Sequence, residues 1–251
     1  MATFVLIHGA MHGGWAWRPV ANILQANGHQ VFTPTLTGQG DRKHLLSQSV
    51  CLETHIDDVT NLLFYEDLED IILVLHSYAG VLAGPLAERC DDRIGKVILA
   101  GGFYARPGES LLDVEPAATA QRYKDLAKSE GEGWFVPASR AFLDQWGVKG
   151  DGLRKFVGDR LTNFPYKCLT DAATFNPECL QKKQRLYIEH TEPPLVSLDL
   201  SRDHAIADGF SHQVICTGHD MMLEYLELTA SALQSIALQQ PAQHMMLPRL
   251  C

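Results

Sequence analysis

The sequence predicts an α/β fold built around a parallel β-sheet. Short apolar runs typical of β-strands alternate with segments of helical periodicity, which is the pattern of successive βαβ units. Two of these runs, at residues 70–75 and 94–99, are almost continuously apolar, as expected for strands that are buried on both faces. With 251 residues, of which 46% are hydrophobic, the chain can bury one substantial core. We therefore expect one α/β domain with an insertion.

The predicted elements follow a regular order up to about residue 105, and the order resumes near residue 184. Strands are expected at residues 3–7, 30–33, 70–75, 94–99, 185–190 and 213–216. Helices are expected at residues 19–27, 53–64, 78–89, 201–208 and 223–238. Residues 106–183 contain helix-like pieces without a clear strand, which predicts a helical cap inserted into a core of residues 1–105 and 184–240. Residues 241–251 lack any periodic pattern and are expected to be a loosely attached tail.

Composition and charge exclude several classes of protein. The net charge is -9 and no cluster of basic residues is present, which excludes nucleic acid as the partner. The sequence has no signal-peptide pattern and no apolar stretch long enough for a membrane span. Its six cysteines are scattered without a Cys-x-x-Cys pair, which indicates reduced thiols in a cytoplasmic protein. We expect no disulfide framework, no metal site and no cofactor.

The strongest chemical signal is a serine between a predicted strand and a predicted helix. Ser77 stands in the run His-Ser-Tyr-Ala-Gly at residues 76–80. A serine on such a sharp turn projects above the sheet, and the amide of Tyr78 points to where negative charge would develop. Leu75 departs from the pattern, because a small residue is usual two places before the serine. The alternative is that Ser77 only caps an ordinary helix.

A glycine-rich loop at residues 8–15 follows the first predicted strand. Glycine lets the backbone approach a ligand closely. Beside a serine nucleophile, the loop at this position supplies a second amide for a negatively charged oxygen, and by position that amide belongs to Ala10. The alternative is a plain tight turn with His8 buried beneath it.

His219 lies in a short loop directly after the last predicted strand. The carboxyl ends of parallel strands meet at one edge of the sheet, so this imidazole can reach Ser77 and act as its general base. The chain order serine, acid, histidine places the acid that orients the base after the strand 185–190. Glu192 is the first carboxylate there, and Asp199 and Asp203 remain open alternatives.

Several segments resemble the small α/β-hydrolases grouped with plant methylesterases, hydroxynitrile lyases and bacterial carboxylesterases. The similar segments are residues 8–17, 35–40, 76–80, 107–110 and 218–220, so the resemblance covers nearly the whole chain. It implies the α/β-hydrolase fold, with a six-stranded parallel sheet and a helical cap over an apolar pocket. The residues that it suggests as pocket lining are Tyr104, Leu111, Trp134, Phe135, Phe142 and Trp146.

The resemblance implies hydrolysis of a carboxylic ester or carbamate of a small, aromatic molecule through an acyl-enzyme. Hydroxynitrile lyases carry a threonine in the loop after the first strand and a lysine after the base, where this chain has Gly9 and Asp220. Without that cation, cyanide release is disfavoured. A ligand-binding protein without catalysis is the second alternative, because a fold does not determine function. We expect a small-molecule partner and leave open whether the chain forms a homodimer.

Overall fold

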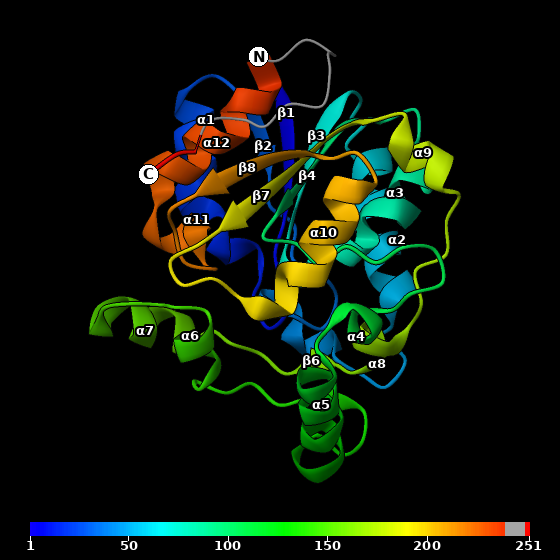
Figure 1. Ribbon diagram of the computed structural model, residues 1–251, viewed down its shortest axis with the longest axis vertical. Coiled ribbons are helices and arrows are strands. Elements are labelled where there is room, and N and C mark those ends of the chain that lie inside the picture. Colours follow the sequence, from blue (N-terminus) through cyan, green and yellow to red (C-terminus); the bar gives the residue numbers. More distant parts are fainter. Residues whose placement is uncertain (239–248) are drawn as a thin grey trace.

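The core of the molecule is a six-stranded, wholly parallel sheet (Figure 1). The computed structural model describes residues 1–238 and 249–251. The strand order is β2-β1-β3-β4-β7-β8. The strands are β1 (Thr3–Ile7), β2 (Gln30–Phe32), β3 (Ile71–His76), β4 (Ile94–Ala100), β7 (Gln184–His190) and β8 (Ser211–Ile215). All six strands predicted from the sequence are confirmed to within two residues at either end.

Helices cover both faces of this sheet. Side chains alternate along each strand, so Phe4 and Leu6 of β1 belong to one apolar cluster, and Val5 and Ile7 belong to the other. The first cluster is completed by α1 (Arg18–Ala26), α11 (Met221–Glu224) and α12 (Leu226–Leu238). The second is completed by α2 (Leu52–Tyr65), α3 (Ala83–Arg89) and α10 (Asp199–Ala207). Short 3₁₀ helices lie at Gly14–Ala16, Gly40–Leu45, Ser77–Leu82 and Val196–Leu198.

The predicted helix 78–89 is divided into a 3₁₀ helix, Ser77–Leu82, and α3. The 3₁₀ segment packs closely on the chain that leaves β4. A Cβ atom on Gly80 would lie only 2.2 Å from the carbonyl oxygen of Phe103. Leu75 is fully buried in the same cluster as Tyr78, so the sheet accommodates the bulky residue before the turn.

The chain between β4 and β7 forms a separate group of short elements near the carboxyl ends of the strands (Figure 1). Its helices are α4 (Leu111–Val114), α5 (Ala117–Glu130), α6 (Phe142–Gln145), α7 (Asp151–Gly158), α8 (Lys167–Thr170) and α9 (Pro177–Gln181). The expectation of no strand here is wrong, because β5 (Phe135–Val136) pairs antiparallel with β6 (Phe164–Pro165). Two residues per strand are too few for a periodic pattern to reveal them.

The end of the chain is bound to the edge of the sheet, contrary to two expectations. Cys216 and Cys251 form a disulfide, whereas the sequence predicts reduced thiols throughout. Leu250 makes a parallel bridge to Ile215, and its amide donates to the carbonyl of Val214 at 3.0 Å. Residues 249–251 are therefore attached to β8, and the rest of the predicted tail, residues 241–248, lies outside the described residues.

Along residues 1–238 and 249–251, no helix combines the length and the apolar character needed to cross a membrane.

Candidate active site

Ser77 occupies a strained turn at the carboxyl end of β3. Its φ angle is 53°, in the left-handed region that side chains other than glycine rarely adopt. Such strain persists only where the surrounding structure enforces it, and it is common at functional sites. Tyr78 follows in the first turn of the 3₁₀ helix, where an amide has no acceptor within the helix.

His219, on the loop after β8, contacts Ser77 directly. Its Nε2 lies 3.0 Å from the Ser77 hydroxyl oxygen, although 142 residues separate the two in the chain. The backbone of His219 is fixed on both sides. Its amide donates to the carbonyl of Trp146 at 3.0 Å, and its carbonyl lies 2.9 Å from Nε2 of His76. The structure thus brings together the serine and the histidine that the sequence singles out.

The group that faces the other nitrogen of His219 is a second histidine. His219 Nδ1 lies 3.0 Å from Nε2 of His190, the last residue of β7, and both side chains are buried. Glu192 lies exposed on the following loop, where its amide donates to the carbonyl of Thr217 at 2.8 Å. The prediction of Glu192 as the partner of the base is therefore corrected to His190.

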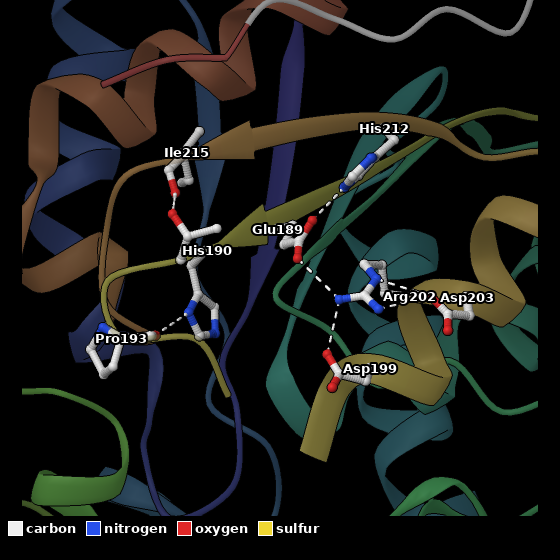
Figure 2. Close-up of polar contacts among 9 residues, drawn as sticks. Glu189, His190, Pro193, Asp199, Arg202, Asp203, His212 and Ile215 are labelled. Atoms are coloured by element: carbon white, nitrogen blue, oxygen red, sulfur yellow. Dashed lines mark hydrogen bonds and ion pairs between the residues drawn. The ribbon is translucent and has the colours of Figure 1, made fainter. Parts of the chain in front are cut away.

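The two alternative acids are engaged elsewhere. Figure 2 shows Asp199 and Asp203 on either side of the Arg202 guanidinium, which also reaches Glu189. Both carboxylates lie 2.9 Å from Arg202 nitrogens. Each is held by this cation on α10.

The hydrogen-bond network determines the tautomers of the two rings. His190 Nδ1 lies 3.1 Å from the carbonyl of Pro193, which can only accept, so Nδ1 carries the proton (Figure 2). Nε2 of the neutral ring then has a lone pair and accepts from His219 Nδ1–H. His219 Nε2 is left with a lone pair that faces the Ser77 hydroxyl. This is the tautomer that a general base for Ser77 requires.

Burial keeps His219 neutral. Loss of hydration, and after it the charges that His76, His190 and His12 carry when protonated, lower the pKa of His219 well below its usual value. The ring is therefore deprotonated at neutral pH and able to take a proton.

The loop after β1 packs tightly on the serine. A Cβ atom on Gly9 would lie 2.6 Å from Ser77 Cβ, so only glycine fits there. Gln39 holds the loop in place by accepting a hydrogen bond from the Met11 amide at 2.9 Å. Ala10 and Tyr78, whose amides are predicted to bind a negatively charged oxygen, both line the same cavity as Ser77.

A buried carboxylate lies beside the base without bonding to it. Asp220 is fully buried, and its Oδ2 lies 3.4 Å from Nε2 of His12 in the loop after β1. Burial alone would lower the pKa of His12, but the charge of Asp220 and the hydrogen bond to Ala10 together raise it. This ion pair connects the two loops that flank Ser77.

Despite the cluster of histidines, no three His, Cys, Asp or Glu side chains of residues 1–238 and 249–251 are arranged to hold a metal ion.

An apolar cavity of about 520 Å³, counted with the solvent-filled space at its mouth, opens above Ser77. Of the predicted pocket residues, Trp146, Leu111 and Phe142 line it. The remaining lining residues are Ala10, Met11, Tyr78, Phe103, Glu115, Tyr123, Val136, Gln145, Phe164, Leu169, Leu195, Ser197 and His219.

Three predicted pocket residues are not part of this lining. The Tyr104 hydroxyl donates to Asp208 at 3.1 Å, which turns the side chain toward α10. Trp134 and Phe135, the first residue of β5, pack edge to face against each other. Aromatic character alone does not distinguish the packing residues of this segment from its lining residues.

Two buried histidines beneath the site predict loss of stability in acid. Burial lowers the pKa of His8 to about 3 and that of His76 to about 4. In the unfolded chain both titrate near 6.5, so the unfolded state takes up protons first as the pH falls. Each histidine is expected to lower the free energy of unfolding by about 2 kcal/mol between pH 7 and pH 5.

Urea unfolding at the two pH values measures this loss. In His76→Gln, the amide can keep the donor to the His219 carbonyl but does not titrate, so the pH dependence should shrink by about 2 kcal/mol. His44→Gln, at an exposed position, is the matched control and should leave the pH dependence of stability unchanged. A pH dependence of stability as large in His76→Gln as in the unaltered protein would contradict the assignment.

Comparison with known proteins adds a family match. The model of the alpha/beta hydrolase family matches residues 4–232. Over 118 residues the chain is 46% identical to the carbendazim hydrolyzing esterase of Nocardioides sp. (strain SG-4G). This match covers 47% of this chain and 49% of the esterase. Over 114 residues it is 30% identical to methyl jasmonate esterase 1 of Vitis vinifera, covering 44% and 43% of the two chains. The matches span about half the length of these relatives or less.

Solved structures agree over nearly the whole chain. An extracellular alpha/beta-hydrolase from a Paenibacillus species has a TM-score of 0.82 at 22% identity, covering 96% of this chain and 100% of that one. A pyrethroid hydrolase from Sphingobium faniae JZ-2 has a TM-score of 0.78 at 22% identity, covering 94% and 97%. At these identities the likeness concerns the fold alone, and it confirms the fold predicted from the sequence.

Proposed function

The chain belongs to the alpha/beta hydrolase family, and from this membership we propose that it hydrolyses a carboxylic ester or carbamate of a small, aromatic molecule. The observation that carries the proposal is the 3.0 Å contact between the Ser77 hydroxyl and His219 Nε2 at the floor of an apolar cavity. The names of its relatives, a carbendazim hydrolyzing esterase and a methyl jasmonate esterase, support the choice of reaction.

In the proposed mechanism, His219 Nε2 takes the hydroxyl proton as Ser77 Oγ attacks the substrate carbonyl. The amides of Ala10 and Tyr78 donate to the oxygen that becomes negatively charged. The tetrahedral intermediate then expels the leaving group, which receives the proton from His219. Water repeats the sequence on the acyl-enzyme, giving its proton to His219 and releasing the acid and free Ser77.

His190 holds the base for these steps. A neutral imidazole accepts from His219 Nδ1–H, where most serine hydrolases use a carboxylate. This bond keeps Nε2 of His219 unprotonated and directed at Ser77. We also propose that residues 106–183 act as a cap, because Leu111, Phe142 and Trp146 of this segment line the cavity above the serine.

A fluorophosphonate probe tests the proposal, because it labels only an activated serine. We expect one adduct per chain, located on Ser77 by peptide mass spectrometry, together with turnover of p-nitrophenyl acetate. Absence of labelling in folded protein would favour the ligand-binding alternative. Labelling at another serine would contradict the assignment of Ser77.

We propose a cytoplasmic location on the basis of the cysteines. Cys51, Cys90, Cys168 and Cys179 are free thiols. The Cys216–Cys251 disulfide runs against this location, because disulfides are rare in the reducing cytosol. Cell fractionation tests the location: the protein should be recovered in the cytosolic fraction, and recovery from the culture medium would contradict the proposal.

A further inference from the structure

A carboxyl group lines the same cavity as Ser77. Glu115 follows α4 and precedes α5. Its side chain is only 7% exposed, and it lines the cavity together with Ser77 and His219. Its Oε2 has no hydrogen-bond partner among the described residues. A buried carboxyl oxygen without a partner is costly, because it has lost its hydration without replacement.

The surroundings of Glu115 leave this acceptor unused. Ser197 hydrogen-bonds to the carboxyl group, and Tyr123 on α5 is the ionisable neighbour. Burial raises the pKa of Glu115 to about 7, against the smaller opposing effect of the Ser197 bond. No lysine or arginine occurs among the described residues that line the cavity. At slightly alkaline pH the cavity therefore presents a carboxylate with one free acceptor oxygen.

We propose that Glu115 is a specificity-determining residue that accepts a hydrogen bond from a neutral N–H group of the substrate, such as that of an azole or an amide. This inference rests on the proposed function, because it names the class of ester or carbamate that Ser77 would cleave.

The rest of the lining supports a neutral, flat substrate. Phe103, Phe142, Phe164 and Leu169 offer apolar surface to an aromatic ring but cannot bond to a polar group on it. A substrate carboxylate would be repelled by Glu115 and would find no cation in the lining. A permanent ammonium group would lose much of its hydration in this apolar space. A neutral N–H donor satisfies Oε2 at the smallest cost of desolvation.

Two matched esters test the proposal. Methyl indole-5-carboxylate carries an N–H group away from the ester, and methyl benzofuran-5-carboxylate has a ring oxygen in its place, so it lacks that donor at nearly the same size and shape. For the unaltered protein we expect kcat/KM to be about 10- to 100-fold higher for the N–H ester, as for a hydrogen bond to a charged acceptor. In Glu115→Leu the ratio should fall to about 1, because no acceptor remains. Each ratio compares two substrates on the same preparation, so it does not depend on the fraction of folded protein.

Two further variants sharpen the test. Glu115→Gln keeps the shape and an uncharged carbonyl acceptor, so a ratio between those of the unaltered protein and Glu115→Leu is expected. Glu130→Leu removes an exposed carboxylate at the end of α5 and should leave the ratio unchanged. A ratio near 1 in the unaltered protein, or a large ratio that persists in Glu115→Leu, would overturn the inference.

Failure of the inference can be separated from failure of the proposed function. The unaltered protein could hydrolyse p-nitrophenyl acetate and be labelled at Ser77 while the two esters react equally. That result would support the hydrolase proposal and contradict the role of Glu115. If neither hydrolysis nor labelling occurs, both proposals fall.

Discussion

Replacing Ser77 with alanine is expected to abolish ester hydrolysis, lowering kcat on the order of 10⁴- to 10⁶-fold. The variant retains the cavity and the predicted amide donors, but no oxygen is left for His219 to activate. Any remaining rate would come from water that attacks substrate held against those amides. Turnover of p-nitrophenyl acetate measures the loss, and labelling by the fluorophosphonate probe should vanish with it.

The matched control for this substitution is Ser129→Ala, at an exposed position on α5. It removes a hydroxyl that bonds only to the backbone of its own helix, so activity should be unchanged. Thermal unfolding of both variants shows whether they are folded. Retained turnover in folded Ser77→Ala would remove the central claim about this site.

The sheet and its active edge could be predicted because they depend on local patterns. Parallel strands buried on both faces must be apolar along their length, and β3 and β4 show this directly in the sequence. Once the strands are placed, the carboxyl-end loops must converge. That geometric requirement brings Ser77 and His219 together without any knowledge of the residues between them.

The partner of the base could not be predicted in the same way. A carboxylate is the usual partner of such a histidine, whereas the role of His190 depends on a proton that is held on Nδ1 by the carbonyl of Pro193. That contact arises from the path of the loop after β7, which no pattern of residue types specifies. The position of His190 is a usable signal, since the strand predicted at 185–190 ends with it, at the carboxyl edge of the sheet.

The pocket and the disulfide escaped prediction for a related reason. The two-residue strands β5 and β6 are too short to impose a direction on most side chains of residues 106–183. Neither the bond of the neighbouring Tyr104 to Asp208 nor the place of Trp146 in the cavity lining therefore follows from a pattern of residue types. Cys216 and Cys251 are 35 residues apart, and only the return of the chain end to β8 brings them together.

Substitution of His190 is expected to have the second largest effect on activity. In His190→Ala, His219 Nδ1–H loses its acceptor, so the ring can rotate and place its proton on the nitrogen that faces Ser77. By analogy with loss of the orienting group in other serine hydrolases, kcat should fall about 10²- to 10⁴-fold while KM changes little. His212→Ala is the control, because this histidine bonds to Glu189 (Figure 2), whereas His190 bonds to His219.

Two replacements of His190 separate positioning from packing through the pH dependence of the rate. The base acts when neutral, and its low pKa means that the unaltered protein should stay active well below pH 6.5. His190→Gln can offer an uncharged acceptor near the place of Nε2, so it should recover much of kcat without moving the acid limb of the profile. His190→Glu would place a negative charge beside His219 and raise its pKa, so that activity is lost at a higher pH as the solution is acidified. If His190→Ala kept full kcat, or if the acid limb of His190→Glu coincided with that of the unaltered protein, the ring of His190 would not act on the base.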